Sequence, residues 1–140
     1  MVVGLIIVAI GGIVLFVASL GIINTMIMAT YERTREIGIL RACGATRKNI
    51  RSLFIFEAGI LGFLGGIIGL VLSYGLAEIG NTLVNGIASS QGVPITNLIS
   101  FPLWLIVSVI ALTTLIGILA GLIPAIRASH LNPVEALRYE

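Results

Sequence analysis

The chain has 140 residues, of which 58% are hydrophobic and 10% are charged, whereas an average soluble domain is about 45–50% apolar and about 25% charged. Its mean hydropathy is +1.16 and it contains 17 glycines, a composition typical of helices that pack together in a lipid bilayer. The formal net charge is only +2. This composition argues against a soluble enzyme, a disordered tail and a nucleic-acid-binding domain.

Three apolar stretches are long enough to cross a bilayer, because about 20 helical residues span its hydrocarbon core. They are residues 2–29, 53–77 and 101–126. The first stretch exceeds the roughly 7–15 apolar residues of a signal peptide, so we interpret it as a spanning helix. The sequence predicts an all-α integral membrane protein with three transmembrane helices. We also expect the chain to be the C-terminal piece of a longer protein.

The basic residues predict the orientation of these spans. None occurs in residues 78–100, and all eight lie in the other two connecting segments: Arg33, Arg35, Arg41, Arg47, Lys48, Arg51, Arg127 and Arg138. Because cytoplasmic loops of membrane proteins are enriched in Lys and Arg, we predict that residues 30–52 and 127–140 are cytoplasmic and that residues 78–100 form an extracytoplasmic loop. Topology then accounts for the positive charge, and no nucleic-acid partner is predicted.

Small residues recur at a spacing of four in the second and third predicted spans. The pairs are Gly62 with Gly66, Gly65 with Gly69, and Gly117 with Gly121. Such a spacing lets two helix backbones approach closely. It predicts helix packing at these glycines, and leaves open whether some of them contact a second copy of the chain.

Glu57 is the one carboxylate clearly inside an apolar run. A charge at the bilayer centre costs at least about 2.5–3.5 kcal/mol, so buried charges are kept mainly where they function. Two interpretations follow: an interfacial carboxylate paired with an arginine such as Arg51 or Arg47, or a proton relay in an ion-coupled transporter.

Groups for catalysis are missing from the sequence. It has a single histidine, His130, a single cysteine, Cys43, and no phosphate-binding P-loop motif. We therefore predict no catalytic residues, no metal site and no cofactor in this chain. If ATP is used, another domain must bind it.

The segment between the first two spans predicts a helix, a break and a second helix. Opposite charges at Glu32 and Arg35, and at Arg33 and Glu36, favour extension of the first span as a cytoplasmic stalk. Gly44 is placed to end this helix in a left-handed conformation, and Thr46 to cap the next one.

An apolar surface is expected on that stalk, formed at helical spacing by Ile37, Leu40 and Gly44, with Ile39 and Cys43 on the adjacent face. The alternatives are a protein-docking surface and contact with the inner leaflet.

Features near the span ends predict their boundaries. We expect Pro124 to kink or end the third span, and Asn132-Pro133-Val134-Glu135 to start a short C-terminal helix. Aromatic residues near span ends are predicted interfacial anchors; they are Tyr31, Phe54, Phe56, Phe101 and Trp104.

Three motifs in order resemble the FtsX-like permease domain of MacB-type ABC transporters. They are the run from Glu32 to Ile50, Glu57 followed by Gly65-Gly66-x-x-Gly69, and the ending from Pro124 to Glu140. The resemblance covers essentially the whole chain. It implies a multi-pass permease of a bacterial or archaeal cell membrane that couples ATP hydrolysis in the cytoplasm to conformational change outside, for export or mechanotransmission.

The resemblance also implies partners and site residues. The partners are a separate or fused ATPase that binds ATP and Mg²⁺, a second permease copy and an extracytoplasmic adaptor. The motif expected to meet the ATPase supplies Glu36, Gly38, Arg41, Gly44, Ala45 and Arg47, and the packed second span supplies Gly62, Gly65, Gly66 and Gly69. Two alternatives remain: an ion-coupled transporter segment centred on Glu57, and a small structural membrane protein acting alone.

Overall fold

The computed structural model describes residues 1–90 and 101–130, with side chains described up to residue 86 in the first range. The helices are α1 (Val2–Glu32), α2 (Thr34–Ala42), α3 (Arg47–Ser90) and α4 (Leu103–Ser129). No β-strand occurs within the described ranges, which confirms the all-α prediction. The helix expected from Asn132 onward lies outside the described residues.

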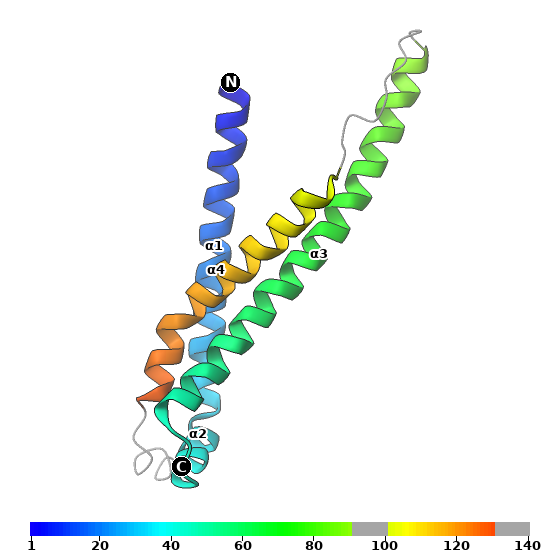
Figure 1. The fold of residues 1–140 in the computed structure, drawn as a ribbon. Helices are drawn as coiled ribbons and strands as arrows, with labels where there is room; N and C mark the ends of the chain where they lie inside the picture. The colour runs from blue at the N-terminus through cyan, green and yellow to red at the C-terminus, as the bar shows by residue number, and fades with distance from the viewer. Residues whose placement is uncertain (91–100, 131–140) are drawn as a thin grey trace.

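Helices α1, α3 and α4 are long and apolar enough to cross a membrane, with mean hydropathies of 2.9, 2.2 and 2.6 in their most apolar windows. This confirms the three predicted spans. Figure 1 shows α3 and α4 running antiparallel beside each other, with α2 at the end of the molecule where α1, α3 and α4 converge. The cytoplasmic segment predicted from the charges thus lies at the convergent end.

Helix α3 is longer than the predicted span. Its 44 residues measure about 66 Å at 1.5 Å per residue, roughly twice the 30 Å thickness of the hydrocarbon core. The helix continues past the expected boundary at Ala77, so residues 78–90 of the expected loop are helical. No proline interrupts these residues, and the Thr82 hydroxyl donates back to the carbonyl of Glu78 within the helix.

Pro124 does not end the third span, because α4 continues to Ser129. A proline inside a helix removes one backbone hydrogen bond. Here the proline ring is fully buried, so packing around it offsets part of that loss.

Helices α3 and α4 approach closely at Gly62 and Gly117. A Cβ at Gly117 would lie 2.6 Å from the carbonyl oxygen of Ala58 and 3.0 Å from the Cα of Gly62, and a Cβ at Gly62 would collide with the carbonyl oxygen of Thr113. The two backbones therefore touch without side chains between them. Glycine is required at both positions by this approach.

The remaining glycines divide into two groups. A Cβ at Gly66 would collide with the Thr113 hydroxyl, and one at Gly121 with the Ala58 side chain. In contrast, a Cβ at Gly65 or Gly69 would have no neighbour within 4 Å among the described residues. The packing predicted for Gly65 and Gly69 is thus not formed within this part of the chain, because no described atom of α4 lies against either position.

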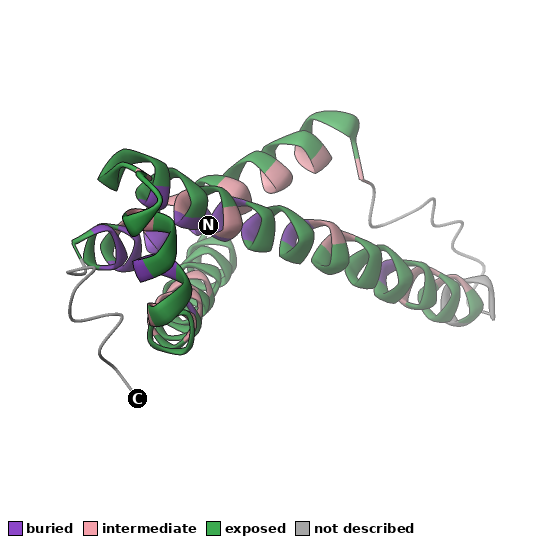
Figure 2. Cartoon of the chain, turned by 90° about the horizontal axis from the view of Figure 1, so that it is seen from below, coloured by how far each residue is buried: buried purple, intermediate pink, exposed green. Residues whose placement is uncertain are grey.

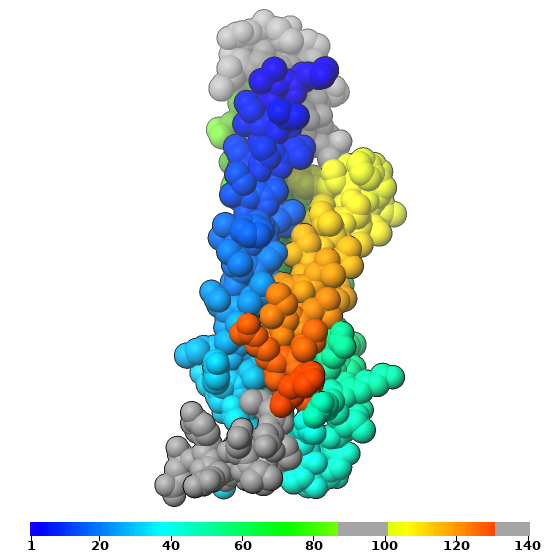
Figure 3. All heavy atoms as spheres, turned by 90° about the vertical axis from the view of Figure 1, so that its left-hand side faces the viewer, coloured from blue at the N-terminus to red at the C-terminus, as the bar shows by residue number. Residues whose placement is uncertain are grey.

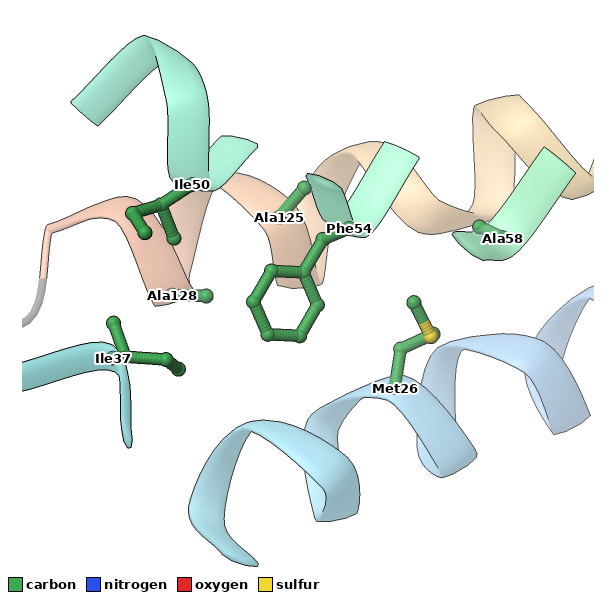
Figure 4. Close-up of a cluster of buried hydrophobic side chains, with 7 residues drawn as sticks. All are labelled: Met26, Ile37, Ile50, Phe54, Ala58, Ala125 and Ala128. Atoms are coloured by element: carbon green, nitrogen blue, oxygen red, sulfur yellow. The ribbon is translucent and has the colours of Figure 1, made fainter. Parts of the chain in front are cut away.

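The hydrophobic core lies at the convergent end, and Figure 2 shows further buried residues along α3. Figure 4 shows this cluster, which takes side chains from all four helices: Met26, Ile37, Ile50, Phe54, Ala58, Ala125 and Ala128. Phe54 is 2% exposed and is among the largest fully buried side chains, so its prediction as an interfacial anchor was wrong.

Helix α1 contributes to this core only near its C-terminal end. Residues 1–14 of α1 are exposed throughout. Figure 3 shows α1 beside the C-terminal half of α4.

Candidate functional site

Helix α2 has an inner face that belongs to the core. Ile37 is 3% exposed and lies in the hydrophobic cluster, and Gly38 next to it is also buried. Ala45, just after the helix, is half-buried and packs against the same cluster. The core therefore fixes α2 against the ends of the membrane helices.

The outer face of α2 is exposed. Ile39 and Leu40 are 47% and 46% exposed, and Glu36 and Cys43 are also exposed. The predicted stripe of Ile37, Leu40 and Gly44 is thus divided, because Ile37 turns into the core while Leu40 remains accessible. Two large apolar side chains consequently lie uncovered outside the predicted spans.

The break between α2 and α3 has the predicted chemistry. Gly44 has φ of +98°, and the Gly44 N–H donates to Arg41 O at 3.1 Å while the Ala45 N–H donates to Leu40 O at 3.0 Å. This pair of bonds is a Schellman motif, in which a left-handed glycine ends a helix. The Asn49 N–H then donates to Thr46 Oγ1 at 3.2 Å, as expected of an N-cap. Both predictions are confirmed.

A further break separates α1 from α2 at a single residue, Arg33, which has φ of −98° and ψ of 15°. The Thr34 hydroxyl lies 2.9 Å from the carbonyl oxygens of Thr30 and Tyr31, carbonyls at the end of α1 that need partners. The predicted uninterrupted stalk is therefore two helices joined at Arg33.

Glu57 pairs with an arginine, as predicted, but its partner is Arg33 and not Arg51 or Arg47. Arg33 Nη1 lies 3.3 Å from Glu57 Oε1, and the two side chains are 52% and 35% exposed. The predicted pair of Arg33 with Glu36 is also incorrect, since the Arg33 guanidinium reaches across to α3. At the break between α1 and α2, the Arg33 side chain extends toward Glu57 of α3. The spacing of residues along the sequence does not reveal this contact.

We expect the Arg33–Glu57 pair to stabilise the fold weakly and to take no part in ion-coupled transport. A double-mutant cycle of Arg33→Met and Glu57→Gln, measured by thermal unfolding in detergent, should give a coupling energy of at most about 1 kcal/mol, as for other exposed ion pairs. Glu57→Gln should leave transport unchanged when the pH gradient is imposed or removed. Loss of gradient-dependent transport in this variant would instead support an ion-coupled transporter.

Arg41 extends from α2 to the end of α4. Its Nη1 donates to the carbonyl oxygen of Ser129 at 2.9 Å, across a sequence separation of 88 residues. The carbonyls in the last turn of a helix have no partners within it. Arg41 therefore satisfies one of them from the neighbouring element.

The other cations of this region face outward. Arg35, Arg47, Lys48 and Arg51 are all exposed. Glu36 and Gly44 are exposed as well, and Arg35 and Glu36 precede Ile39 and Leu40 by four residues, a spacing that makes them neighbours on the helix surface. Residues 1–90 and 101–130 contain no group of three or more His, Cys, Asp or Glu that could hold a metal ion.

The six predicted coupling residues thus separate into two sets. Glu36, Gly44 and Arg47 are exposed, whereas Gly38 is buried and Ala45 and Arg41 are half-buried. The sequence reasoning missed the roles of Arg33, Ser129 and Met26. Their partners are distant in the sequence, and no local spacing identifies them.

Comparison with known proteins gives the family. The sequence model of the protein family described as FtsX-like permease C-terminal matches residues 8–133 of this chain. The chain is 41% identical over 135 residues to an uncharacterized ABC transporter permease of Methanocaldococcus jannaschii, MJ1507, covering 96% of this chain and 32% of that protein. It is 42% identical over 133 residues to the uncharacterized ABC transporter permease YknZ of Bacillus subtilis, covering 94% of this chain and 30% of that protein.

The name of a third relative describes both an ATP-binding part and a permease part. The macrolide export ATP-binding/permease protein MacB of Syntrophobacter fumaroxidans is 38% identical over 132 residues, which cover 94% of this chain and 17% of that protein. The chain belongs to the FtsX-like permease family and is a multi-pass membrane component of an ABC transporter permease. It spans about a third or less of the length of these relatives.

Proposed function

We propose that this permease component couples ATP hydrolysis by a partner ATPase, which binds ATP and Mg²⁺, to conformational change on the far side of the membrane. The observation that carries the proposal is the exposed outer face of α2. Ile39 and Leu40 are nearly half exposed beside a core that fixes the inner face of the same helix. An apolar surface rimmed by charged residues is typical of a protein–protein contact.

The charge pattern supports a cytoplasmic position for this surface. Cytoplasmic loops are enriched in Lys and Arg, and α2 and the first turns of α3 carry Arg35, Arg47, Lys48 and Arg51. We accordingly place residues 30–52 and 127–140 in the cytoplasm and residues 78–100 outside it. ATP is then available on the side of the membrane where α2 lies.

The membrane helices suit a mechanical role better than a channel. The α3–α4 contact is made by backbone against backbone at Gly62 and Gly117, which leaves no passage there. Helix α3 extends about 20 Å beyond residue 77 at 1.5 Å per residue. We propose that it transmits motion outward to an extracytoplasmic partner, in an assembly with a second permease copy, and that the activity is export or mechanotransmission.

Cross-linking through Cys43 tests the proposed docking. Cys43 is the single cysteine and is exposed at the end of α2. In membranes containing the whole transporter, a short bifunctional maleimide–amine reagent should join Cys43 to the ATPase, and the yield should change when ATP is added. Cys43→Ser should abolish the product. Labelling of Cys43 by a membrane-impermeant maleimide added only outside the cell would contradict the proposal.

A further inference from the structure

The side chain of Arg41 lies on the inner face of α2. Arg41 follows Ile37 by four residues and Gly38 by three, spacings that place all three on one side of a helix. Ile37 and Gly38 are buried against the core. The Arg41 guanidinium is thereby directed toward α4 and away from the outer face formed by Ile39 and Leu40.

The end of α4 is a suitable acceptor for this cation. The C-terminal end of a helix carries a partial negative charge, which favours Lys or Arg nearby. Ser129 Oγ and His130 Nδ1 lie 2.7 and 2.9 Å from the carbonyl oxygen of Ile126, and the His130 N–H donates to Arg127 O at 3.1 Å. The carbonyl of Ser129 receives its hydrogen bond from Arg41, 2.9 Å away.

We infer that Arg41 is a positioning residue that clamps α2 to the C-terminal end of α4, and that its role in coupling does not require contact with the ATPase. This inference rests on the proposed function. When the ATPase displaces the outer face of α2, the Arg41–Ser129 bond makes α4 follow. The glycine contact between α4 and α3 then carries the displacement to α3.

The clamp itself can be measured without any ATPase activity. In a Cys43→Ser background, cysteines replace Ile37 of α2 and Ala128 of α4, which belong to the same hydrophobic cluster (Figure 4). Removing a hydrogen bond from a charged donor by Arg41→Met should slow disulfide formation between them on the order of tenfold. An unchanged rate would show that Arg41 does not hold the two helices together.

Rescue then tests the role in coupling. In the full-length transporter with its ATPase, Arg41→Met should lower transport-coupled ATP hydrolysis on the order of tenfold. Oxidising the cysteine pair at positions 37 and 128 should restore coupling in this variant, and reduction should remove it again. The matched control is the same cysteine pair with Arg41 retained, and its coupling in each redox state is the reference value for the Arg41→Met variant.

The outcomes separate the inference from the proposed function. If Arg41→Met leaves transport-coupled ATP hydrolysis unchanged, the inference is overturned. Coupling lost and not restored by the disulfide would overturn it as well, if Cys43 still cross-links to the ATPase in a separate Arg41→Met variant that retains Cys43 and carries no engineered cysteines. That result would indicate that Arg41 acts in the ATPase contact. Failure of the wild-type Cys43 cross-link would contradict the proposed function and leave the disulfide-rate result standing.

Discussion

Replacing Gly62 with alanine is expected to destabilise the chain by about 1–3 kcal/mol, the usual cost of forcing an extra group into a packed contact. The new methyl group would collide with the carbonyl oxygen of Thr113 and lie 3.1 Å from the Cα of Gly117. Both neighbours are backbone atoms, so neither can rotate away. The loss should appear as a lower midpoint of thermal unfolding in detergent and as less α3–α4 cross-linking.

Gly65→Ala is the matched control for this substitution. Gly65 lies in the same helix, three residues from Gly62, and an alanine methyl there would meet no described atom within 4 Å. Since alanine is about 0.5–1 kcal/mol better than glycine inside a helix, this variant should be as stable as the wild type or slightly more so. Equal destabilisation by the two substitutions would show that Gly62 is not in a backbone contact.

The second large effect is expected at Leu40. Its side chain is 46% exposed, so Leu40→Glu should change the free energy of unfolding by no more than about 0.5 kcal/mol. In the proposed complex the same side chain is covered by the ATPase, and burying an unpaired carboxylate there is costly. Transport-coupled ATP hydrolysis should therefore fall by at least about tenfold, on the scale of 1.5–3 kcal/mol for a buried leucine.

Two variants check this interpretation of α2. Leu40→Met keeps the volume and the apolar character and should couple normally. Ile37→Ala should show the opposite pattern from Leu40→Glu, because Ile37 is 3% exposed and truncation of a buried isoleucine costs about 2–5 kcal/mol of stability. Normal coupling in Leu40→Glu, with binding of the ATPase intact, would refute docking at the outer face.

Local features of the fold were predictable because their causes are local. The break between α2 and α3 depends on a left-handed conformation that glycine adopts readily, and on a hydroxyl at the N-cap. Gly44 has φ of +98° and Thr46 accepts the bond from the Asn49 N–H. Each requirement is met within a few residues of the chain.

The partners of charged residues were less predictable. Glu57 was expected to pair with an arginine nearby in sequence, yet it pairs with Arg33, 24 residues away. Arg41 was assigned to the ATPase contact from its place in a motif, yet it donates to Ser129 O. Flexible side chains can reach many acceptors, so only the relative positions of the helices select one.

Composition and periodicity alone determined that the chain is helical, that three of its segments suit a bilayer, and that the basic residues gather in the connecting segments predicted to lie on one side. Each of these properties depends on many residues together, so a wrong interpretation of any single residue does not change the prediction. Which glycines touch, which face of α2 is buried and which groups the arginines reach were decided only in three dimensions. Those choices depend on how helices rotate and cross when their side chains compete for the same space, and no segment of the sequence contains that information by itself.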